Sequence, residues 1–247
     1  MEGLGRILMA LQTEGAINFT DIAAEFDGEV PHSISEYYGA SVDLPESGVF
    51  SMSDFYGTSN IPELTYVTTF TGEGATAVDL GDAADDRFIV VVTACANNGS
   101  ALSSIDVGGT ALTIRNGTGT VGWENAGLGY AFIPSGSGNQ NITVNWTGSS
   151  VISSVYVIRK AEVGFVNWWT GGSINTDIET EVGDCIIGAT ASPNTGYPTW
   201  TIEGVTDPQD HTQRVGTLDY TANSFQAVDT STSIQTGGYE IAIVQVR

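Results

Sequence analysis

The chain has 247 residues, and its 29 Asp and Glu residues against 7 Lys and Arg residues give a formal net charge of −22 at pH 7. A negative field of this size repels a phosphate backbone, so the composition argues against a nucleic-acid partner. The length fits one large β domain, or a small module followed by a larger domain.

The first twelve residues, MEGLGRILMALQ, predict a short amphipathic helix. Leu4, Ile7, Leu8 and Leu11 follow the i, i+3, i+4, i+7 spacing of one helix face. The apolar core ILMAL is too short to cross a bilayer, follows Arg6 and lacks a small-residue cleavage site, so we expect neither a membrane span nor a signal peptide. This helix is expected to dock through its apolar face.

An eight-residue pattern then occurs twice, as GAINFTDI from Gly15 and as GVFSMSDF from Gly48. In each copy, large apolar residues alternate as in a short strand. The pairs Thr20–Asp21 and Ser53–Asp54 follow, and each supplies a predicted N-cap hydroxyl and an acid for the positive end of a helix. Each octet is therefore predicted to lead from a strand into a helix.

Between the octets, the sequence PHSISEYYG contains a capping box. Ser33 and Glu36 have the S-x-x-E spacing in which the serine caps the helix and the glutamate bonds back to it. The predicted helical turn carries Tyr37 and Tyr38 and ends at Gly39.

Residues 1–60 are too few to bury a substantial core, yet they are rich in aromatic side chains. We therefore interpret them as a small α+β attachment module. Its apolar side chains could pack on the chain's own second domain or, at an assembly joint, on another subunit. The predicted assembly interface comprises Leu4, Ile7, Leu8, Leu11, Phe19, Phe26, Tyr37, Tyr38, Phe50, Phe55 and Tyr56.

A connector around Pro62 precedes residues 61–247, which are predicted to be β throughout. Short runs rich in Val, Ile, Thr and aromatic residues alternate with Gly, Asn, Asp and Ser clusters. Gly108–Gly109 is a predicted two-residue hairpin turn. At least eight such runs indicate a mainly β fold, an antiparallel β-sandwich of jelly-roll or immunoglobulin-like type. The apolar run Phe88–Ala96 predicts a strand that is buried on both faces.

Cys95 and Cys185 lie inside apolar runs without a CxxC spacing. We interpret them as buried free thiols in strands, with a single disulfide as the alternative and no metal site.

Catalytic motifs are absent from the sequence. It has two histidines, and neither His32 nor His211, which lies in a predicted polar turn, belongs to a G-x-S-x-G, H-E-x-x-H or P-loop pattern. We expect no enzyme, no catalytic residue, no cofactor and no metal, although a carboxylate pair of glycosidase type would leave no local signature.

The acid-rich segment GDAADDR offers oxygen ligands that suit Ca²⁺ in Asp82, Asp85 and Asp86. It lacks the ligand spacing of an EF-hand loop. We therefore expect a solvated turn in which Arg87 is the partner of the acids.

Aromatic residues near turns suggest a saccharide platform. Trp168 and Trp169 precede a Gly-Gly pair, and Tyr197 and Trp200 lie in a loop marked by Gly and Pro. Apolar sugar faces stack on such rings, and sugar hydroxyls bond to nearby amides and carboxylates. The alternative is that these rings cover the ends of the sandwich core.

The segment from Gly15 to Gly57 resembles one that is common in tailed-bacteriophage virion proteins. That segment runs approximately G-x-I-S-F-S-D-I-x-x-E-F-G, P-x-S-L-S-E-Y-Y and I-P-x-S-G-x-I-S-M-S-D-F-Y-G. This chain departs from it at Asn18, which replaces Ser, and at Asp27 before Gly28. The later text, including DLGDAADDRFIVVV, looks more loosely like phage β domains. The resemblance implies a structural particle protein with no catalytic residues to carry over.

The leading hypothesis is therefore a virion protein of a tail fibre or baseplate appendage, located on the tail. Residues 1–60 would anchor it to other virion proteins, and residues 61–247 would face outward, with a host-surface glycan as a candidate ligand. Because fibres commonly trimerise, a homo-oligomer, specifically a trimer, is expected. The alternatives are a decoration protein on the capsid surface, a carbohydrate-active enzyme that degrades host polysaccharide, and a non-viral adhesin.

Overall fold

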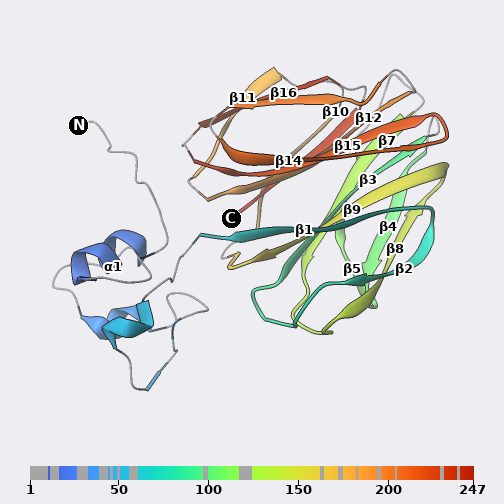
Figure 1. Ribbon diagram of the computed structural model, residues 1–247. Helices are drawn as coiled ribbons and strands as arrows, with labels where there is room; N and C mark the ends of the chain where they lie inside the picture. Colours follow the sequence, from blue (N-terminus) through green and yellow to red (C-terminus); the bar gives the residue numbers. More distant parts are fainter. Residues whose placement is uncertain are drawn as a thin grey trace.

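A computed structural model gives the fold of the chain (Figure 1). The structure describes residues 11, 17–26, 33–38, 44, 47–48, 51–55, 61–96, 100–116, 124–161, 164–171, 175–181, 183–193, 196–203, 205–228, 231–237 and 240–247.

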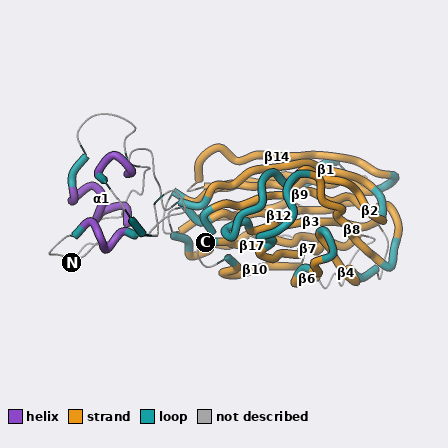
Figure 2. The backbone as a smooth tube through the Cα atoms, turned by 90° about the horizontal axis from the view of Figure 1, so that it is seen from below, coloured by secondary structure: helices purple, strands orange, loops and turns teal. Residues whose placement is uncertain are grey.

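The described part of the first sixty residues is helical. It contains the α-helix α1 (Phe19–Phe26) and the 3₁₀ turns η1 (Ile34–Tyr37) and η2 (Met52–Phe55), and no strand falls among its described residues. Figures 1 and 2 both place these turns to one side of the sheets, at the end where the C-terminus lies.

The region after Ile61 is built of antiparallel sheets, as the sequence predicted. Its first half forms two sheets. The five-stranded sheet has the order β1 (Glu63–Thr71), β9 (Ser149–Arg159), β3 (Phe88–Ala96), β7 (Glu124–Phe132), β6 (Thr113–Asn116). The four-stranded sheet has the order β2 (Gly74–Asp79), β8 (Asn139–Trp146), β4 (Leu102–Val107), β5 (Thr110–Ala111).

The second half forms two further sheets. The five-stranded sheet has the order β10 (Phe165–Gly171), β17 (Glu240–Val246), β12 (Cys185–Pro193), β15 (Leu218–Ala227), β14 (Val205–Val215). The three-stranded sheet has the order β11 (Asn175–Glu179), β16 (Ser231–Gly237), β13 (Thr199–Glu203).

The two halves share one topology. Replacing β1, β9, β3, β7 and β6 by β10, β17, β12, β15 and β14 converts one five-stranded sheet into the other, and β2, β8 and β4 correspond in the same way to β11, β16 and β13. The corresponding pairs are antiparallel in both halves, with Phe88 at the start of β3 opposite Phe132 at the end of β7, and Cys185 at the start of β12 opposite Gln226 near the end of β15. This internal repeat was not recognised in the sequence.

The predicted hairpin at Gly108–Gly109 is confirmed. The two glycines have φ values of 58° and 89°, and Val107 pairs with Thr110 across the turn. Positive φ at both central residues is the conformation of a type I′ turn, which glycine adopts without steric cost.

The four sheets stack as layers, with an apolar cluster between each neighbouring pair (Figure 1). Strand β3 explains the continuous apolar run in the sequence. Val90, Val92 and Ala94 face the second half, whereas Ile89 and Val91 face the four-stranded sheet of their own half. Both faces of this strand are therefore buried, as predicted, but one is covered by the other half of the chain.

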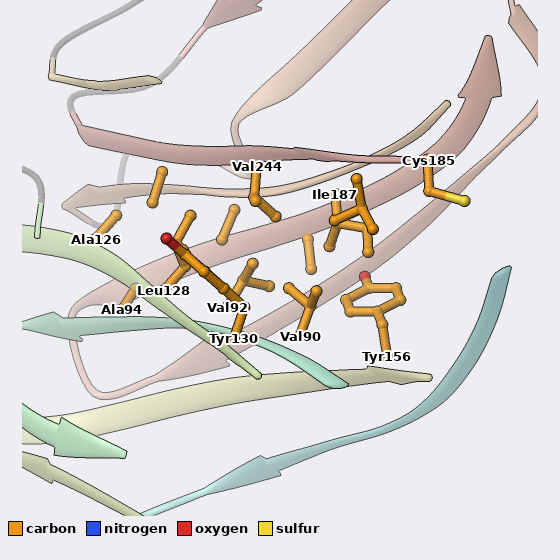
Figure 3. Close-up of a cluster of buried hydrophobic side chains, with 14 of the residues drawn as sticks. Val90, Val92, Ala94, Ala126, Leu128, Tyr130, Tyr156, Cys185, Ile187 and Val244 are labelled. Carbon is orange, nitrogen blue, oxygen red and sulfur yellow. The ribbon is translucent and has the colours of Figure 1, made fainter. Parts of the chain in front are cut away.

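The central cluster joins the two halves. In Figure 3, Val90 and Val92 from one sheet point toward Ile187 and Val244 from the other. Tyr220 adds a polar link across the layers, because its hydroxyl donates to the carbonyl of Val92 at 3.3 Å.

Cys185 lies in the central cluster and Cys95 in the cluster of the first half. Both thiols are buried and neither forms a disulfide, in agreement with the preferred interpretation of the sequence. Burial raises the pKa of Cys185 to about 12 and also raises that of Cys95.

Arg87 has a different role from the one expected. Its buried guanidinium donates to backbone carbonyls, including those of Ile133 at 2.9 Å and Gly136 at 2.8 Å, so it fixes the loop backbone instead of pairing with the neighbouring acids. Asp86 pairs with Arg159 at 3.3 Å. Among the described residues, no group of three or more His, Cys, Asp or Glu side chains is placed to hold a metal ion.

Replacing Ile187 with Ala tests the shared core. We expect the free energy of unfolding to fall by about 2–5 kcal/mol, because a buried side chain is truncated. Since the cluster belongs to both halves, calorimetry should still record one unfolding transition. Val228→Ala, at a side chain that is 40% exposed, is the control and should change the free energy by less than about 0.5 kcal/mol. Two separate transitions would show that the halves are energetically independent.

Candidate functional site

The N-terminal module is built from three capped turns with one pattern. In α1, the side-chain oxygen of Asn18 accepts hydrogen bonds from the backbone N–H groups of Thr20 at 2.8 Å and Asp21 at 3.1 Å. The Asp21 carboxylate in turn accepts from the Asn18 N–H at 3.0 Å. This is a reciprocal capping box, which satisfies backbone donors that the start of a helix leaves unpaired.

The other two turns share the bond from the first backbone N–H to the acid three residues later. Ser33 caps η1 and its N–H donates to Glu36 at 3.0 Å, so the predicted capping box is confirmed. At η2, the N–H of Ser51 donates to Asp54 at 2.6 Å. The three turns therefore read N-F-T-D-I, S-I-S-E-Y and S-M-S-D-F, each with the cap first and the acid fourth.

The predicted caps at Thr20 and Ser53 were wrong by two positions. The acid that bonds back to a cap stands three residues after it, so the caps are Asn18 and Ser51. This three-residue spacing is present in the sequence, whereas the predicted caps at Thr20 and Ser53 stand directly before their aspartates.

The fifth residue of each turn points into one small core. Ile22, Tyr37 and Phe55 are 0%, 1% and 0% exposed. The Tyr37 ring meets the Phe55 ring edge to face at 5.6 Å, and Phe26 lies 6.4 Å from Tyr37. Burial and the neighbouring Glu36 raise the pKa of Tyr37 to about 12.

Part of the predicted assembly interface lies inside the module. Leu11, Tyr37 and Phe55 are buried in the module's own cluster, and Phe26 is partly buried against it. Leu4, Ile7, Leu8, Phe50 and Tyr56 lie outside the described residues.

Two members of the predicted interface remain nearer the surface. Phe19 is 37% exposed, and Tyr38 is half-buried with its hydroxyl bonded to the carbonyl of Gly48 at 2.5 Å. Among the described residues of the module, Phe19 is the one large apolar side chain classed as exposed.

Ser51→Ala tests the assignment of the caps. We expect the free energy of opening η2 to fall by about 0.5–2 kcal/mol, because the Ser51 hydroxyl that donates to the Asp54 carboxylate at 3.0 Å is lost. Native-state hydrogen exchange at the backbone amides of η2 measures this change. Ser53→Ala removes the neighbouring hydroxyl that bonds to the Ser51 hydroxyl at 2.6 Å and should have a smaller effect, and a larger effect there would restore the original assignment.

The four predicted glycan-binding aromatic residues differ in their surroundings. Trp168 lies 5.5 Å from the guanidinium carbon of Arg115, which also lies 5.6 Å from the Phe165 ring and 5.8 Å from the Tyr130 ring. Such cation–π contacts occupy the face of Trp168 at the junction of the two halves.

Trp200 and Tyr197 have different neighbours. The indole N–H of Trp200 donates to the buried hydroxyl of Thr190 at 3.2 Å, and its ring packs so closely on Gly188 that a Cβ there would lie 2.6 Å from it. Trp200 thus covers the core of the second half, as the alternative interpretation proposed. Tyr197 is 46% exposed, and the guanidinium carbon of Arg214 lies 5.5 Å from its ring.

Trp169 lines a hollow of about 690 Å³ between the edge strands β10 and β11. Its apolar lining includes Val166 and Ile178, and its polar lining includes Asp177 and Glu179. A second hollow of about 500 Å³ shares Trp169 and is also lined by Trp168, Thr170 and Thr176.

Carboxylates dominate the charge of the larger hollow. Asp177 and Glu179 are exposed and have no ion-pair partner among the described residues, whereas Arg247 at one end is held by Asp184 at 2.8 Å and by Glu181 at 2.6 Å. The positive charge of Arg247 is thus neutralised by these two carboxylates, and the hollow keeps a net negative charge.

The sequence interpretation singled out Trp169 in this hollow but missed Asn167, Asp177 and Glu179. The alternation in NTDIE, with Ile178 buried and its neighbours exposed, was the available signal that Asp177 and Glu179 share one face of a strand.

His211 lies in β14 and not in the predicted polar turn. Its ring stacks on Tyr66 from the first half, with centroids 3.4 Å apart and an angle of 11°. Burial lowers the pKa of His211, while the nearby Asp210 opposes that shift. Its Nε2 atom has no hydrogen-bond partner in the described part of the chain.

The stacked histidine predicts a pH dependence of stability. Because the pKa of His211 is lower in the folded chain than its usual value of 6.5, the unfolded chain binds more protons as the pH falls below that value. The contribution of His211 to the free energy of unfolding is therefore complete above pH 6.5, and it is lost as the pH falls through the pKa of His211 in the folded chain. We expect His211→Gln to show a shallower fall over that window in urea titrations, and identical slopes would contradict the assignment.

Comparisons with protein-family models, with curated proteins and with solved structures gave no match. A search of the described helices found none of the length and apolarity that a membrane crossing requires.

Proposed function

We propose that the chain is a structural component of a tailed-bacteriophage particle, specifically a tail fibre or baseplate appendage. The observation that carries this proposal is the module of three capped turns within residues 15–57, the segment that resembles phage virion proteins. Its three turns surround one small core and precede a much larger β region. Such a module suits an anchor, and the β region suits the displayed part.

We further propose that each half of the β region is a jelly roll. In the first half the orders β1-β9-β3-β7 and β2-β8-β4-β5 give two facing four-stranded sheets, with β6 added to one edge. The second half repeats this arrangement except for β5. The next described strand after β13 is β14, which pairs only in the five-stranded sheet. Jelly rolls are frequent in viral capsid and lectin domains, which is compatible with a particle role.

The shared central cluster supports a role as a rigid displayed body. Two domains joined only by a linker would move relative to each other, whereas a large apolar interface fixes them. The net charge of −22 would keep such bodies soluble and mutually repelling at the high local concentration of a particle surface.

Location on the particle tests the proposal. Electron microscopy of virions labelled with an antibody to the β region should show label on the tail. Label on the head would instead support the decoration protein, and no label on purified virions would refute a particle role.

Attachment through the module has its own test. Phe55→Asp places a charge in the module's core, so we expect particles that lack the protein to bind this variant at least tenfold less than the unchanged chain. Phe132→Asp, at a side chain of the β region that is 40% exposed, is the matched control and should rebind normally. If both variants bound as well as the unchanged chain, the module would not be the anchor.

A further inference from the structure

We propose that the groove along β10 and β11, centred on Trp169, binds a linear glycan that carries no negative charge. This inference concerns a ligand of the isolated chain and goes beyond the proposed place on a particle.

The groove is open because it lies between two sheet edges. β10 is the outer strand of its five-stranded sheet and β11 the outer strand of its three-stranded sheet. No strand covers the space between them in the described chain, so Ile178, from the core cluster of this half, and Trp169, which packs against that cluster, also line the hollow.

The shape of the groove favours a chain over a single compact ligand. The hollows of about 690 Å³ and 500 Å³ each have the size of a small-molecule site, and both are lined by Trp169. A ligand that fills both must extend past this ring. A linear oligosaccharide does so with successive sugar units.

The chemistry of the lining matches sugar units. The indole of Trp169 offers an apolar surface for the C–H face of a pyranose ring. Asp177 and Glu179 offer carboxylate acceptors, and the Asn167 side chain lines the same hollow. Hydrogen bonds from hydroxyls to ionised carboxylates are stronger than bonds between neutral groups, so these residues would orient the sugar.

The charge of the groove selects among glycans. Asp177 and Glu179 lack cationic partners among the described residues, and Arg247 is already bound by two carboxylates. A uronate, sialate or phosphate group would be repelled by this wall, whereas neutral sugars are accepted and protonated amino sugars attracted.

An extended peptide added to a strand edge fits the groove less well. The register of β10 with β17 shifts between Phe165 and Asn167, and such bulges are a common device that blocks the addition of a further strand. β11 has only five residues and offers a short edge.

Calorimetric titration of the full purified chain tests the proposal. The probes are three linear hexasaccharides: one of neutral β-1,4-linked glucose, one of glucosamine with free amino groups, and one of galacturonate. We expect the first two to bind and the third not to bind. The inference would be overturned if neither the glucose probe nor the glucosamine probe bound at millimolar concentration. It would also be overturned if the chain preferred the galacturonate probe.

Variants then locate the site. Trp169→Ala should weaken binding at least tenfold, and Trp169→Phe, which keeps a ring on the core, should retain part of it and controls for loss of folding. Tyr197→Ala is the matched control, because it removes an exposed aromatic ring outside the groove and should leave affinity unchanged. The double change Asp177→Asn and Glu179→Gln should abolish any preference for the amino-sugar probe.

Equal losses from Trp169→Ala and Tyr197→Ala would refute the location, as would binding of an extended peptide in place of sugars. Because no particle enters these experiments, their failure would leave the proposed virion role standing, and the labelling experiment would decide that role separately.

Discussion

The apolar cluster between the two five-stranded sheets is the contact on which the rest of the β region depends. It buries one face of β3 and of β12. The other face of each strand is covered by the smaller sheet of its own half, so both faces are removed from water. Apolar burial of this kind is the main favourable term in folding. We therefore expect the two topologically equivalent halves to unfold as one body, and polar contacts such as the Tyr220 hydroxyl on Val92 also link them.

The N-terminal module is stabilised in a different way. Its core has few members, including Ile22, Tyr37 and Phe55, and a core of this size contributes little by itself. Reciprocal caps at α1 and η1, and the bond from the Ser51 N–H to Asp54 at η2, satisfy backbone groups at the start of each turn. The rings of Tyr37 and Phe55 are buried in this core, whereas Phe19 is exposed and Phe26 and Tyr38 are partly buried. The proposed particle contact would then depend on these three residues and on residues outside the described part of the module.

The groove at Trp169 follows from the same layered construction. Stacked sheets bury their faces but leave their outermost strands without neighbours, and carboxylates or bulges commonly protect such edges. Here the edge between β10 and β11 combines an aromatic ring with Asp177 and Glu179. A feature that keeps an edge from aggregating can thus also supply the apolar and polar parts of a sugar site.

The sequence by itself determined the local features: the β character after Ile61, the glycine hairpin at Gly108–Gly109, the capping box at Ser33 and the double-sided burial of Phe88–Ala96. These depend on contacts between residues near each other in the chain or on a strand's own alternation. Only the tertiary structure decided that Val92 faces Val244, that Trp169 lines a groove while Trp200 lies in the core, and that Tyr37 meets Phe55. Alternation shows that a side chain is buried, but which distant element covers it depends on how whole sheets stack, and no local pattern encodes that.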